Sequence, residues 1–305
     1  MPDDSFTGDE VVAPVRWRVV HTTIYDYAAP VLVCHNQIHL APRDTPRQAI
    51  VAHRVEVDPA PGRIAEHVDV FGNRVGSFVV EQPHGRLAVT ATTEVDVCAT
   101  AAPDDDGSRW EDVAALAVGH TGPEGPSLRG MRLDSPLVRR HDAVTAWAAE
   151  SFPPGRSWRA GLEDLTRRIH RDFAYDPGAT TVSTPVEQVF ALRRGVCQDF
   201  AHLQIACLRA LGLPTRYVSG YIASGTTAGG DGAALVGADA SHAWLSCWGG
   251  RAGWVDVDPT NDCLVGGRHV TVAWGRDYGD VCPIKGVYVG GGQHRLQVAV
   301  DVRRV

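Results

Sequence analysis

The stretch RRGVCQDFAHLQIACLRALG, residues 193–212, decides how this chain is built because it sets a cysteine at the start of a helix. Gly195 ends the preceding segment, and the apolar spacing predicts a helix over 197–211, closed by Gly212. The apolar stripe of this helix consists of Phe200, Ala201, Ile205, Leu208 and Leu211, and Leu203 and Cys207 broaden it toward full burial. We therefore expect a buried helix whose first residue is Cys197.

A cysteine in this position has two interpretations. Unpaired backbone N–H groups and the helix dipole stabilise an anion at a helix start, so Cys197 is a candidate thiolate nucleophile. Arg193 and Arg194 would add to this stabilisation, whereas Asp199 would either oppose it or cap the helix, according to where it points. On position alone, a small packed side chain is the simpler interpretation. Whether Cys197 acts as a nucleophile therefore depends on catalytic partners elsewhere in the chain.

The stretch SHAWLSCWGGRAGWVDVDPTND, residues 241–262, predicts a β-hairpin around a glycine-rich loop. Alternation places two groups of side chains on one face each: His242, Trp244 and Ser246, then Trp254, Asp256 and Asp258. If the loop is symmetric about Gly250, His242 lies directly opposite Asp258, with Cβ atoms roughly 5 Å apart. A slip of two residues would offer Asp256 or Thr260 to the histidine instead.

Cysteine chemistry on a carbonyl group needs three partners. These are a thiolate, a base that holds and later delivers a proton, and a carboxylate that fixes the tautomer of that base. Cys197, His242 and Asp258 supply these three residue types in suitable local settings.

Three motifs together carry a family resemblance. GVCQDFA at 195–201, HAW at 242–244 and DPTN at 258–261 resemble the bacterial transglutaminase-like family of cysteine peptidases and acyltransferases. The resemblance implies a papain-like core with a catalytic triad of Cys197, His242 and Asp258. The DPTN context selects Asp258 over Asp256. The motifs Pro42–Asp44 and Phe71–Asn73 resemble the β-rich N-terminal region that is often fused to this bacterial subgroup.

The chain as a whole predicts an α+β protein. Short alternating β-branched stretches between Trp17 and about Val97 predict a β-rich N-terminal domain, residues 1–98. Residues 99–133, rich in Ala, Gly, Pro and Asp, are typical of a linker or a loosely packed connection. Residues 134–305 are expected to form the transglutaminase-like catalytic domain, with the cysteine helix packed on an antiparallel sheet.

The groups that would assist the reaction are less clearly marked. The backbone N–H of Cys197, at the helix start, is a natural donor to a tetrahedral oxyanion. Tyr175 or Gln198 would supply a second donor, although packing of Tyr175 under the following loop is an equal alternative. Trp244 would frame the cleft, and aromatic cross-strand packing explains it equally well.

Composition narrows the setting. The formal net charge of −7 argues against nucleic acid or an anionic membrane as the main partner. Seven cysteines without a C-x-x-C pair, and an acidic N-terminus without an apolar run, favour a reduced cytoplasmic setting. No metal site and no cofactor are expected, because the histidines and cysteines lack ligand spacing.

The expected function is acyl chemistry on an amide of a protein or peptide, through a thioester on Cys197. Water as the acceptor gives hydrolysis, which we slightly favour, and an amine gives transamidation. Two alternatives stay open: acyl transfer like that of arylamine N-acetyltransferases, and a non-catalytic binding module with a transglutaminase fold. The intact set of Cys197, His242 and Asp258 argues against the second alternative.

Overall fold

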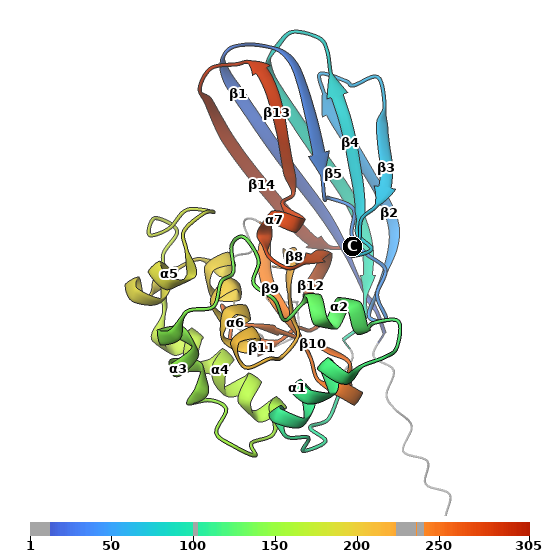
Figure 1. Cartoon of the computed structure of the whole chain (residues 1–305). Helices are drawn as coiled ribbons and strands as arrows, with labels where there is room; N and C mark the ends of the chain where they lie inside the picture. Colours follow the sequence, from blue (N-terminus) through green and yellow to red (C-terminus); the bar gives the residue numbers. More distant parts are fainter. Residues whose placement is uncertain (1–12, 100–102, 224–235, 237–240) are drawn as a thin grey trace, which may run out of the picture.

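The computed structural model describes residues 13–99, 103–223, 236 and 241–305. These residues form an elongated β-rich part and a mixed α/β core (Figure 1). The β-rich part is one seven-stranded sheet, made of β1 (Val15–Ile38), β2 (Gln48–Asp58), β3 (Ile64–Val68), β4 (Arg74–Val80), β5 (His84–Val97), β13 (Ile284–Gly290) and β14 (His294–Arg304).

Strand β1 organises this sheet because it pairs along two different parts of its length. Up to Tyr27 it pairs with β5 and β14, and from Val31 it pairs with β4 and β13. A register shift between Asp26 and Val31 separates the two parts, and the sheet curls there (Figure 1). Every second residue of β5 is buried from Leu87 onward, as expected for a strand with one face in a core. Side chains from both parts therefore share one core, which includes Val31, Cys34, Ile38, Phe78, Val80, Leu87 and Val89.

The two C-terminal strands correct the expected domain boundary. Residues 284–304 were expected in the catalytic domain, but β13 and β14 pair with β1 and complete the N-terminal sheet. Alternation can predict such strands but carries no information about a partner so distant in sequence. Gly290, Gly291 and Gly292 all have positive φ and form the turn between β13 and β14.

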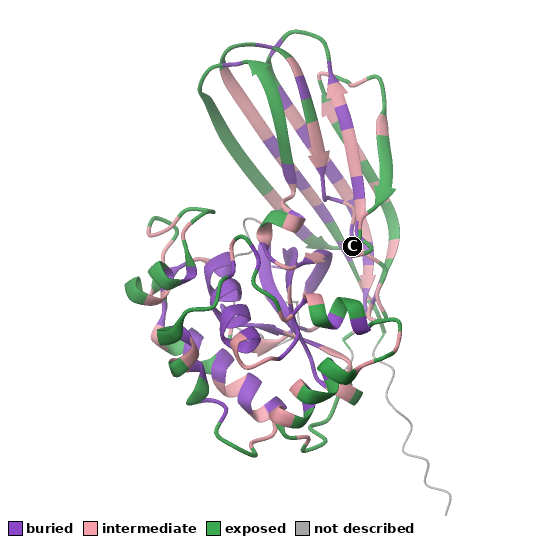
Figure 2. Cartoon of the chain, viewed as in Figure 1, coloured by how far each residue is buried: buried purple, intermediate pink, exposed green. Residues whose placement is uncertain are grey.

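The core is built on a second, antiparallel sheet of order β11-β10-β9-β8-β12. Its strands are β8 (Thr215–Ile222), β9 (His242–Trp248), β10 (Trp254–Asp258), β11 (Cys263–Leu264) and β12 (His269–Gly275). The helices are α1 (Trp110–Gly119), α2 (Gly125–Gly130), α3 (Asp142–Ala149), α4 (Trp158–Asp172), α5 (Val186–Leu192), α6 (Cys197–Ala210) and α7 (Tyr278–Val281), with the short parallel strands β6 (Ala174–Tyr175) and β7 (Arg194–Gly195). Helix α6 packs on β8 and β9 and is buried along nearly its whole length (Figure 2).

The segment expected to be a linker belongs to the core. It contains α1 and α2, and Val113, Ala117 and Leu128 are buried in the same hydrophobic cluster as α6. Its apolar residues are few, but the spacing of 113 and 117 puts two of them on one helix face. The composition of the segment did not predict its burial in the core, because alanine, glycine and proline dominate it.

The two parts of the molecule meet through side chains that bond to the backbone of β12. The Gln48 amide accepts from the backbone N–H of Thr271 and donates to its carbonyl, both at 2.8 Å. Asn73, which is fully buried, accepts from the backbone N–H of Trp274 at 3.0 Å and donates to its carbonyl at 2.9 Å. Two side-chain amides thus continue the hydrogen bonding of β12 in place of a neighbouring strand.

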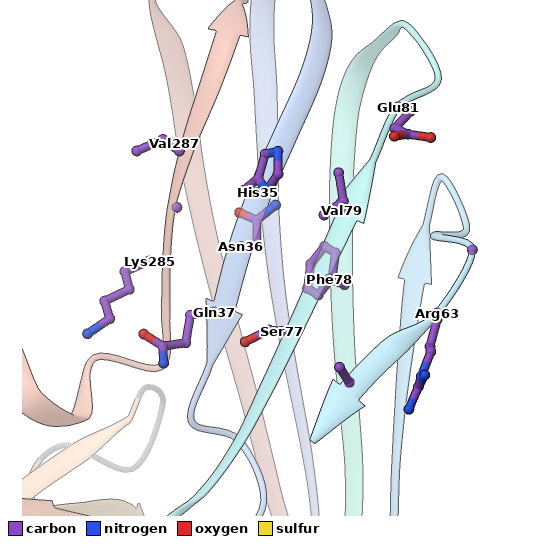
Figure 3. Close-up of a pocket in the computed structure, with 13 residues that line it drawn as sticks. His35, Asn36, Gln37, Arg63, Ser77, Phe78, Val79, Glu81, Lys285 and Val287 are labelled. Atoms are coloured by element: carbon purple, nitrogen blue, oxygen red, sulfur yellow. The ribbon is translucent and has the colours of Figure 1, made fainter. Parts of the chain in front are cut away.

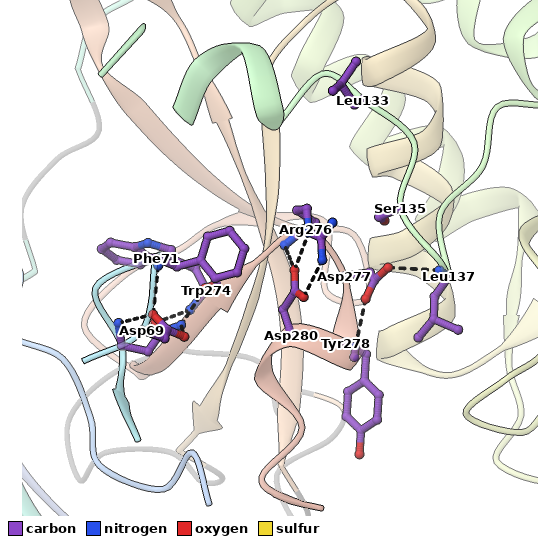
Figure 4. Close-up of polar contacts among 12 residues, drawn as sticks. Asp69, Phe71, Leu133, Ser135, Leu137, Trp274, Arg276, Asp277, Tyr278 and Asp280 are labelled. Atoms are coloured by element: carbon purple, nitrogen blue, oxygen red, sulfur yellow. Dashed lines mark hydrogen bonds and ion pairs between the residues drawn. The ribbon is translucent and has the colours of Figure 1, made fainter. Parts of the chain in front are cut away.

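The loop that presents Asn73 is tied together by Asp69. One carboxylate oxygen of Asp69 accepts from the backbone N–H groups of Phe71 and Asn73, and the other accepts from the Asn73 amide. Figure 4 shows Asp69 beside Phe71 and Trp274. Arg43 donates to Asn73 Oδ1 at 2.6 Å and lies over the Trp274 ring. Arg43 of the Pro42–Asp44 motif and Asn73 of the Phe71–Asn73 motif therefore both contact the core through Trp274.

The predicted α+β class is confirmed, with its β-rich first domain and its cysteine helix packed on an antiparallel sheet. The helix expected at 197–211 spans 197–210. Within the residues that the structure describes, no helix combines the length and the apolar character needed to cross a membrane.

Candidate active site

Cys197 starts α6 because local features stop the chain just before it. Arg193 takes the left-handed conformation, with φ 54°, and ends α5. The next two residues form β7 and pair with β6. A Cβ added to Gly195 would lie 2.6 Å from a carboxylate oxygen of Asp199, so glycine lets the chain pass this close to the helix start.

Asp199 caps the helix. Its Oδ2 accepts from the backbone N–H of Val196 at 2.8 Å and from the Thr180 hydroxyl at 2.6 Å. Burial raises the pKa of Asp199, although these two hydrogen bonds act in the opposite direction. The direction in which Asp199 points, left open by the sequence, is thus back along the chain.

The two arginines before the cysteine have other partners. The guanidinium of Arg193 lies over the rings of Phe190 and Phe173, at 4.1 and 4.7 Å. Arg194 is exposed and lies 3.5 Å from a carboxylate oxygen of Asp176. Their expected stabilisation of a thiolate therefore finds no support in these contacts.

Strands β9 and β10 form the expected hairpin, but in a register two residues away from the symmetric one. Trp248 pairs with Trp254 and Leu245 with Val257, so the loop spans residues 249–253 and contains a short 3-10 turn. In this register Asp258 follows opposite Trp244, and His242 reaches the carboxylate diagonally. An even slip keeps each side chain on its face, so the predicted pair forms with different geometry.

Asp258 is fully buried and is the most heavily bonded side chain of the site. Oδ1 accepts from the backbone N–H groups of Thr260 and Asn261, at 2.9 and 3.3 Å. Oδ2 accepts from the Asn261 amide at 2.7 Å and lies 2.8 Å from His242 Nε2. The Thr260 and Asn261 contacts explain the DPTN motif, because both residues that follow the proline hold the carboxylate in place.

His242 lies between this carboxylate and the thiol. Burial disfavours its imidazolium form, but the negative charges of Asp258 and Cys197 outweigh burial and raise the pKa of His242 to about 10. The same interactions hold the pKa of Asp258 well below its usual range, despite a burial effect in the opposite direction. Nε2 faces Asp258, and Nδ1 is buried without a hydrogen-bond partner among the described residues, so Nδ1 is the nitrogen available to Cys197. The site therefore favours a charged ring next to the sulfur.

His269 is a further member of the site that the sequence did not indicate. Its Nε2 lies 3.2 Å from Asp258 Oδ2, and its Nδ1 accepts from the backbone N–H of Gly266 at 3.4 Å. Accepting at Nδ1 places the proton on Nε2, so a neutral His269 donates to Asp258. No motif marks His269, because it lies on β12. This strand pairs with the edge of β8 that faces away from β9.

Asp258, His269 and Cys263 bring one ligand-type atom each within 4.8 Å of one another. Asp258 and His269 already bond to each other, and burial raises the pKa of Cys263 to about 12. Because Asp258 and His269 are engaged with each other and Asp258 also with His242, we assign no metal to these residues.

Tyr175 and Gln198, the two candidates for an oxyanion donor, differ in their placement. The charges of Cys197 and Asp258 act on Tyr175 and, after burial, help to raise its pKa to about 12, so its hydroxyl keeps its proton. The amide of Gln198 donates to the carbonyl of Val182 at 2.9 Å and is occupied there. Tyr175 is thus the better placed of the two.

Trp244 is fully buried behind the histidines. Its ring contacts His242 and His269 at centroid distances of 6.2 and 5.3 Å, and its Nε1 lies 3.5 Å from Asp256. These contacts correspond to the packing alternative, in which Trp244 supports His242 from behind.

A large hollow lies elsewhere, on the β-rich domain. It has a volume of about 880 Å³ and is lined by residues of β1, β3, β4 and β13, among them His35, Phe78 and Lys285 (Figure 3). Cavity size alone would therefore point away from Cys197, and the chemistry of the side chains locates the site.

Comparisons with known proteins agree with this arrangement. The model of the bacterial transglutaminase-like N-terminal region matches residues 17–96, and that of the transglutaminase-like superfamily matches residues 145–259. The second range contains Cys197, His242 and Asp258.

Relatives extend the match to nearly the whole chain. An uncharacterized protein of Mycobacterium tuberculosis (strain ATCC 25618 / H37Rv) is 42% identical over 300 residues, which cover 94% of this chain and 92% of the relative. The protein-glutamine gamma-glutamyltransferase of Pseudomonas aeruginosa is 37% identical over 98 residues, 32% of this chain and 14% of that protein. A crystal structure of a candidate cysteine protease from Cytophaga hutchinsonii superimposes with a TM-score of 0.76 at 21% identity, over 96% of this chain and 92% of that one. The chain therefore belongs to the transglutaminase-like superfamily, in the bacterial branch that carries the transglutaminase-like N-terminal region.

Proposed function

We propose that the protein is a cysteine-dependent enzyme that acts on an amide of a protein or peptide through a thioester on Cys197. The observation that carries the proposal is the buried His242, which lies between the Asp258 carboxylate and the Cys197 thiol and has a raised pKa. A charged imidazole beside a sulfur at a helix start is the arrangement that keeps a cysteine ready as a thiolate.

In the first half of the reaction, the sulfur of Cys197 attacks the amide carbonyl carbon, and the carbonyl electrons move onto oxygen. As the C–N bond breaks, the proton on Nδ1 of His242 passes to the nitrogen, which leaves as ammonia or an amine. A thioester remains. In the second half, His242 takes a proton from the acceptor, whose oxygen or nitrogen attacks the thioester carbon and expels the sulfur as thiolate.

The negative charge on the carbonyl oxygen needs donors in place before the attack. The backbone N–H of Cys197, in the first turn of α6, is one such donor. We assign the second to the Tyr175 hydroxyl, because Tyr175 pairs with Gly195, two residues before Cys197, and its hydroxyl keeps its proton.

Water is the acceptor that we favour, which makes the enzyme a peptidase or amidase. An amine acceptor is the second candidate, and it is supported by the similarity of a third of the chain to a protein-glutamine gamma-glutamyltransferase. Both reactions share the thioester, so the residues named above serve either one.

Thiol labelling tests the nucleophile. Iodoacetamide is applied across pH to the wild type, to Cys197→Ala and to His242→Ala, and the labelled peptides are located by mass spectrometry. Burial raises the pKa of Cys207 and Cys247 to about 12, so these thiols give little background. We expect fast labelling at Cys197 near pH 6, slowed at least tenfold in His242→Ala, because an ordinary thiol of pKa about 8.5 is scarcely ionised there. Equal labelling of several cysteines, unchanged in His242→Ala, would overturn the proposal.

Product analysis then separates the two acceptors. A glutamine-containing peptide is incubated with the enzyme, and ammonia release is measured with and without an added primary amine. Ammonia with a glutamate product indicates hydrolysis, and incorporation of the amine indicates transamidation. Acetyl-coenzyme A with an arylamine serves as the test of the N-acetyltransferase alternative, for which we expect no turnover.

A further inference from the structure

A second cavity lies between the two parts of the molecule, away from Cys197. It has a volume of about 550 Å³ and is walled by the residues that follow β1, by β10 and by β12. A smaller hollow of about 190 Å³ adjoins it and shares four of its residues: Glu124, Arg216, Trp254 and Trp274. A cavity of this size at a domain boundary is a common setting for a small ligand.

Arg216, on β8, is the central cation of this cavity. Its guanidinium lies over the rings of Trp254 and Trp274, at 4.3 and 3.6 Å from their centroids. Among the residues that the structure describes, the guanidinium meets no hydrogen-bond acceptor, and its Nε is buried without a partner. The two indole rings thus fix the orientation of the Arg216 guanidinium, and its N–H groups are left available to a ligand.

Arg43 provides an internal comparison. It lies over the same Trp274 ring at the same 3.6 Å, but it donates to Asn73 and does not line the cavity. The Nε of both arginines is buried without a partner, but Arg43 has a protein acceptor for its Nη1, whereas Arg216 faces the hollow. Burial lowers the pKa of Arg216 to about 10, so it remains charged at neutral pH.

The charges of the side chains that line the cavity, Arg216 included, sum to zero. Arg47 donates to the carbonyl of Val265 and lies 3.9 Å from Asp256, while Glu124 is exposed at the rim. Two arginines and two carboxylates therefore line the hollow. The apolar walls come from Pro46, Pro103, Val265 and the two tryptophans.

From this geometry we infer that the cavity is a binding site for a small molecule with a free carboxylate, of the kind found at the C-terminus of a peptide. A carboxylate accepts two parallel hydrogen bonds from an arginine fork, and its organic part would lie against the indole and proline walls. Asp256 and Glu124 already balance the charges of the two arginines, so a dianion such as phosphate is disfavoured more strongly than a carboxylate, which adds a single negative charge beside the free donors of Arg216.

Calorimetric titration of the full chain with N-acetyl-glycyl-leucine tests this inference. The matching alcohol, N-acetyl-glycyl-leucinol, lacks the carboxylate, and inorganic phosphate supplies a dianion. Quenching of tryptophan fluorescence gives a second readout, because two indoles form the walls. We expect the acid to bind, and the alcohol and phosphate to bind at least about tenfold more weakly.

Three variants assign the binding to Arg216. Arg216→Gln removes the charge and Arg216→Lys keeps it without the fork, and both should weaken binding of the acid at least about tenfold. Arg43→Gln, which removes the other arginine on Trp274, should leave binding within about twofold of the wild type. Thermal unfolding shows that each variant is folded.

Equal binding of acid and alcohol, tighter binding of phosphate, no binding of any probe, or unchanged binding by Arg216→Gln would each overturn the inference. If Arg43→Gln weakens binding as much as Arg216→Gln, the two arginines are merely structural contacts of the domain boundary, and the inference fails as well. The readouts do not involve Cys197, so the result is independent of the proposed acyl chemistry.

Discussion

Replacing Asp258 with asparagine tests the electrostatic core of the proposed mechanism. The change keeps the shape of the side chain but removes the charge that faces His242 and His269. Oδ2 accepts from three donors, one on Asn261 and one on each histidine, so an amide nitrogen at that position would meet only other donors. If the amide turns over, its nitrogen instead faces the backbone N–H groups of Thr260 and Asn261. Neither orientation satisfies the site.

The expected loss of unfolding free energy in Asp258→Asn follows from the charges of His242 and Asp258. A pKa of about 10 for His242, against the ordinary 6.5, corresponds to roughly 5 kcal/mol in favour of the charged ring. Burial of the ring without Asp258 would favour its neutral form, so most of this preference disappears in Asp258→Asn. Loss of one partner from a buried charge pair costs about 3–5 kcal/mol. We expect the free energy of unfolding to fall by about 3 kcal/mol near pH 6.

The pH dependence has a definite sign. The pKa of His242 is raised in the folded protein, so its contribution to stability is complete below pH 6.5 and declines as the pH rises toward about 10. The pKa of Asp258 is lowered, so its contribution is present above pH 3.8 and is lost as the pH falls below that value. The stability difference between wild type and Asp258→Asn should therefore be largest between about pH 4 and 6.5.

Two assays check these expectations. Urea denaturation at several pH values gives the free energy of unfolding, and iodoacetamide labelling at pH 6 gives the reactivity of Cys197, which should fall at least about tenfold. Asp262→Asn is the matched control, since Asp262 is exposed and asparagine also tolerates its positive φ of 47°. A loss of stability below about 0.5 kcal/mol, with labelling at the wild-type rate, would refute the reasoning.

Three other substitutions probe separate parts of the structure. Tyr175→Phe should lower kcat about tenfold on the amide substrate with little change in KM, because it removes an oxyanion donor; an unchanged kcat would exclude the hydroxyl from that role. His269→Gln should shift the pH profile of Cys197 labelling and lower kcat by about three- to tenfold, because a donor to Asp258 is altered; a profile identical to wild type would show that this histidine only packs. Asn73→Ala should reduce the free energy of unfolding by about 2–4 kcal/mol in urea denaturation, since it leaves the backbone of Trp274 without its partners. A loss under about 0.5 kcal/mol there would contradict the assigned contact.

The features that the sequence predicted are those with a local signal. Gly195 and the apolar stripe after it predict where α6 begins, and the structure starts the helix at Cys197. The alternating stretches around GGRAG predict the hairpin of β9 and β10. Its register differs because five residues, not a loop centred on Gly250, form the turn, and turn geometry sets the register.

The features that the sequence did not predict depend on contacts between distant segments. His269 joins Asp258 through the crossing of β12 to the far side of β8, which no spacing records. The cavity around Arg216 needs the first domain as its wall, and a tryptophan from each of β10 and β12. The membership of α1 and α2 in the core rests on a few apolar side chains within a segment of alanine and glycine.

The pairing of β1 with β14 also has a consequence for biosynthesis. Trp17 pairs with Arg304, so β1 leaves the ribosome long before β14, which completes its sheet. At about 5–20 residues per second, that delay is on the order of 15–60 s. During this time one side of β1 presents free backbone groups to other chains. Nascent chains should therefore depend on a chaperone more than the compact core alone would require, and removal of β14 should damage the N-terminal domain first.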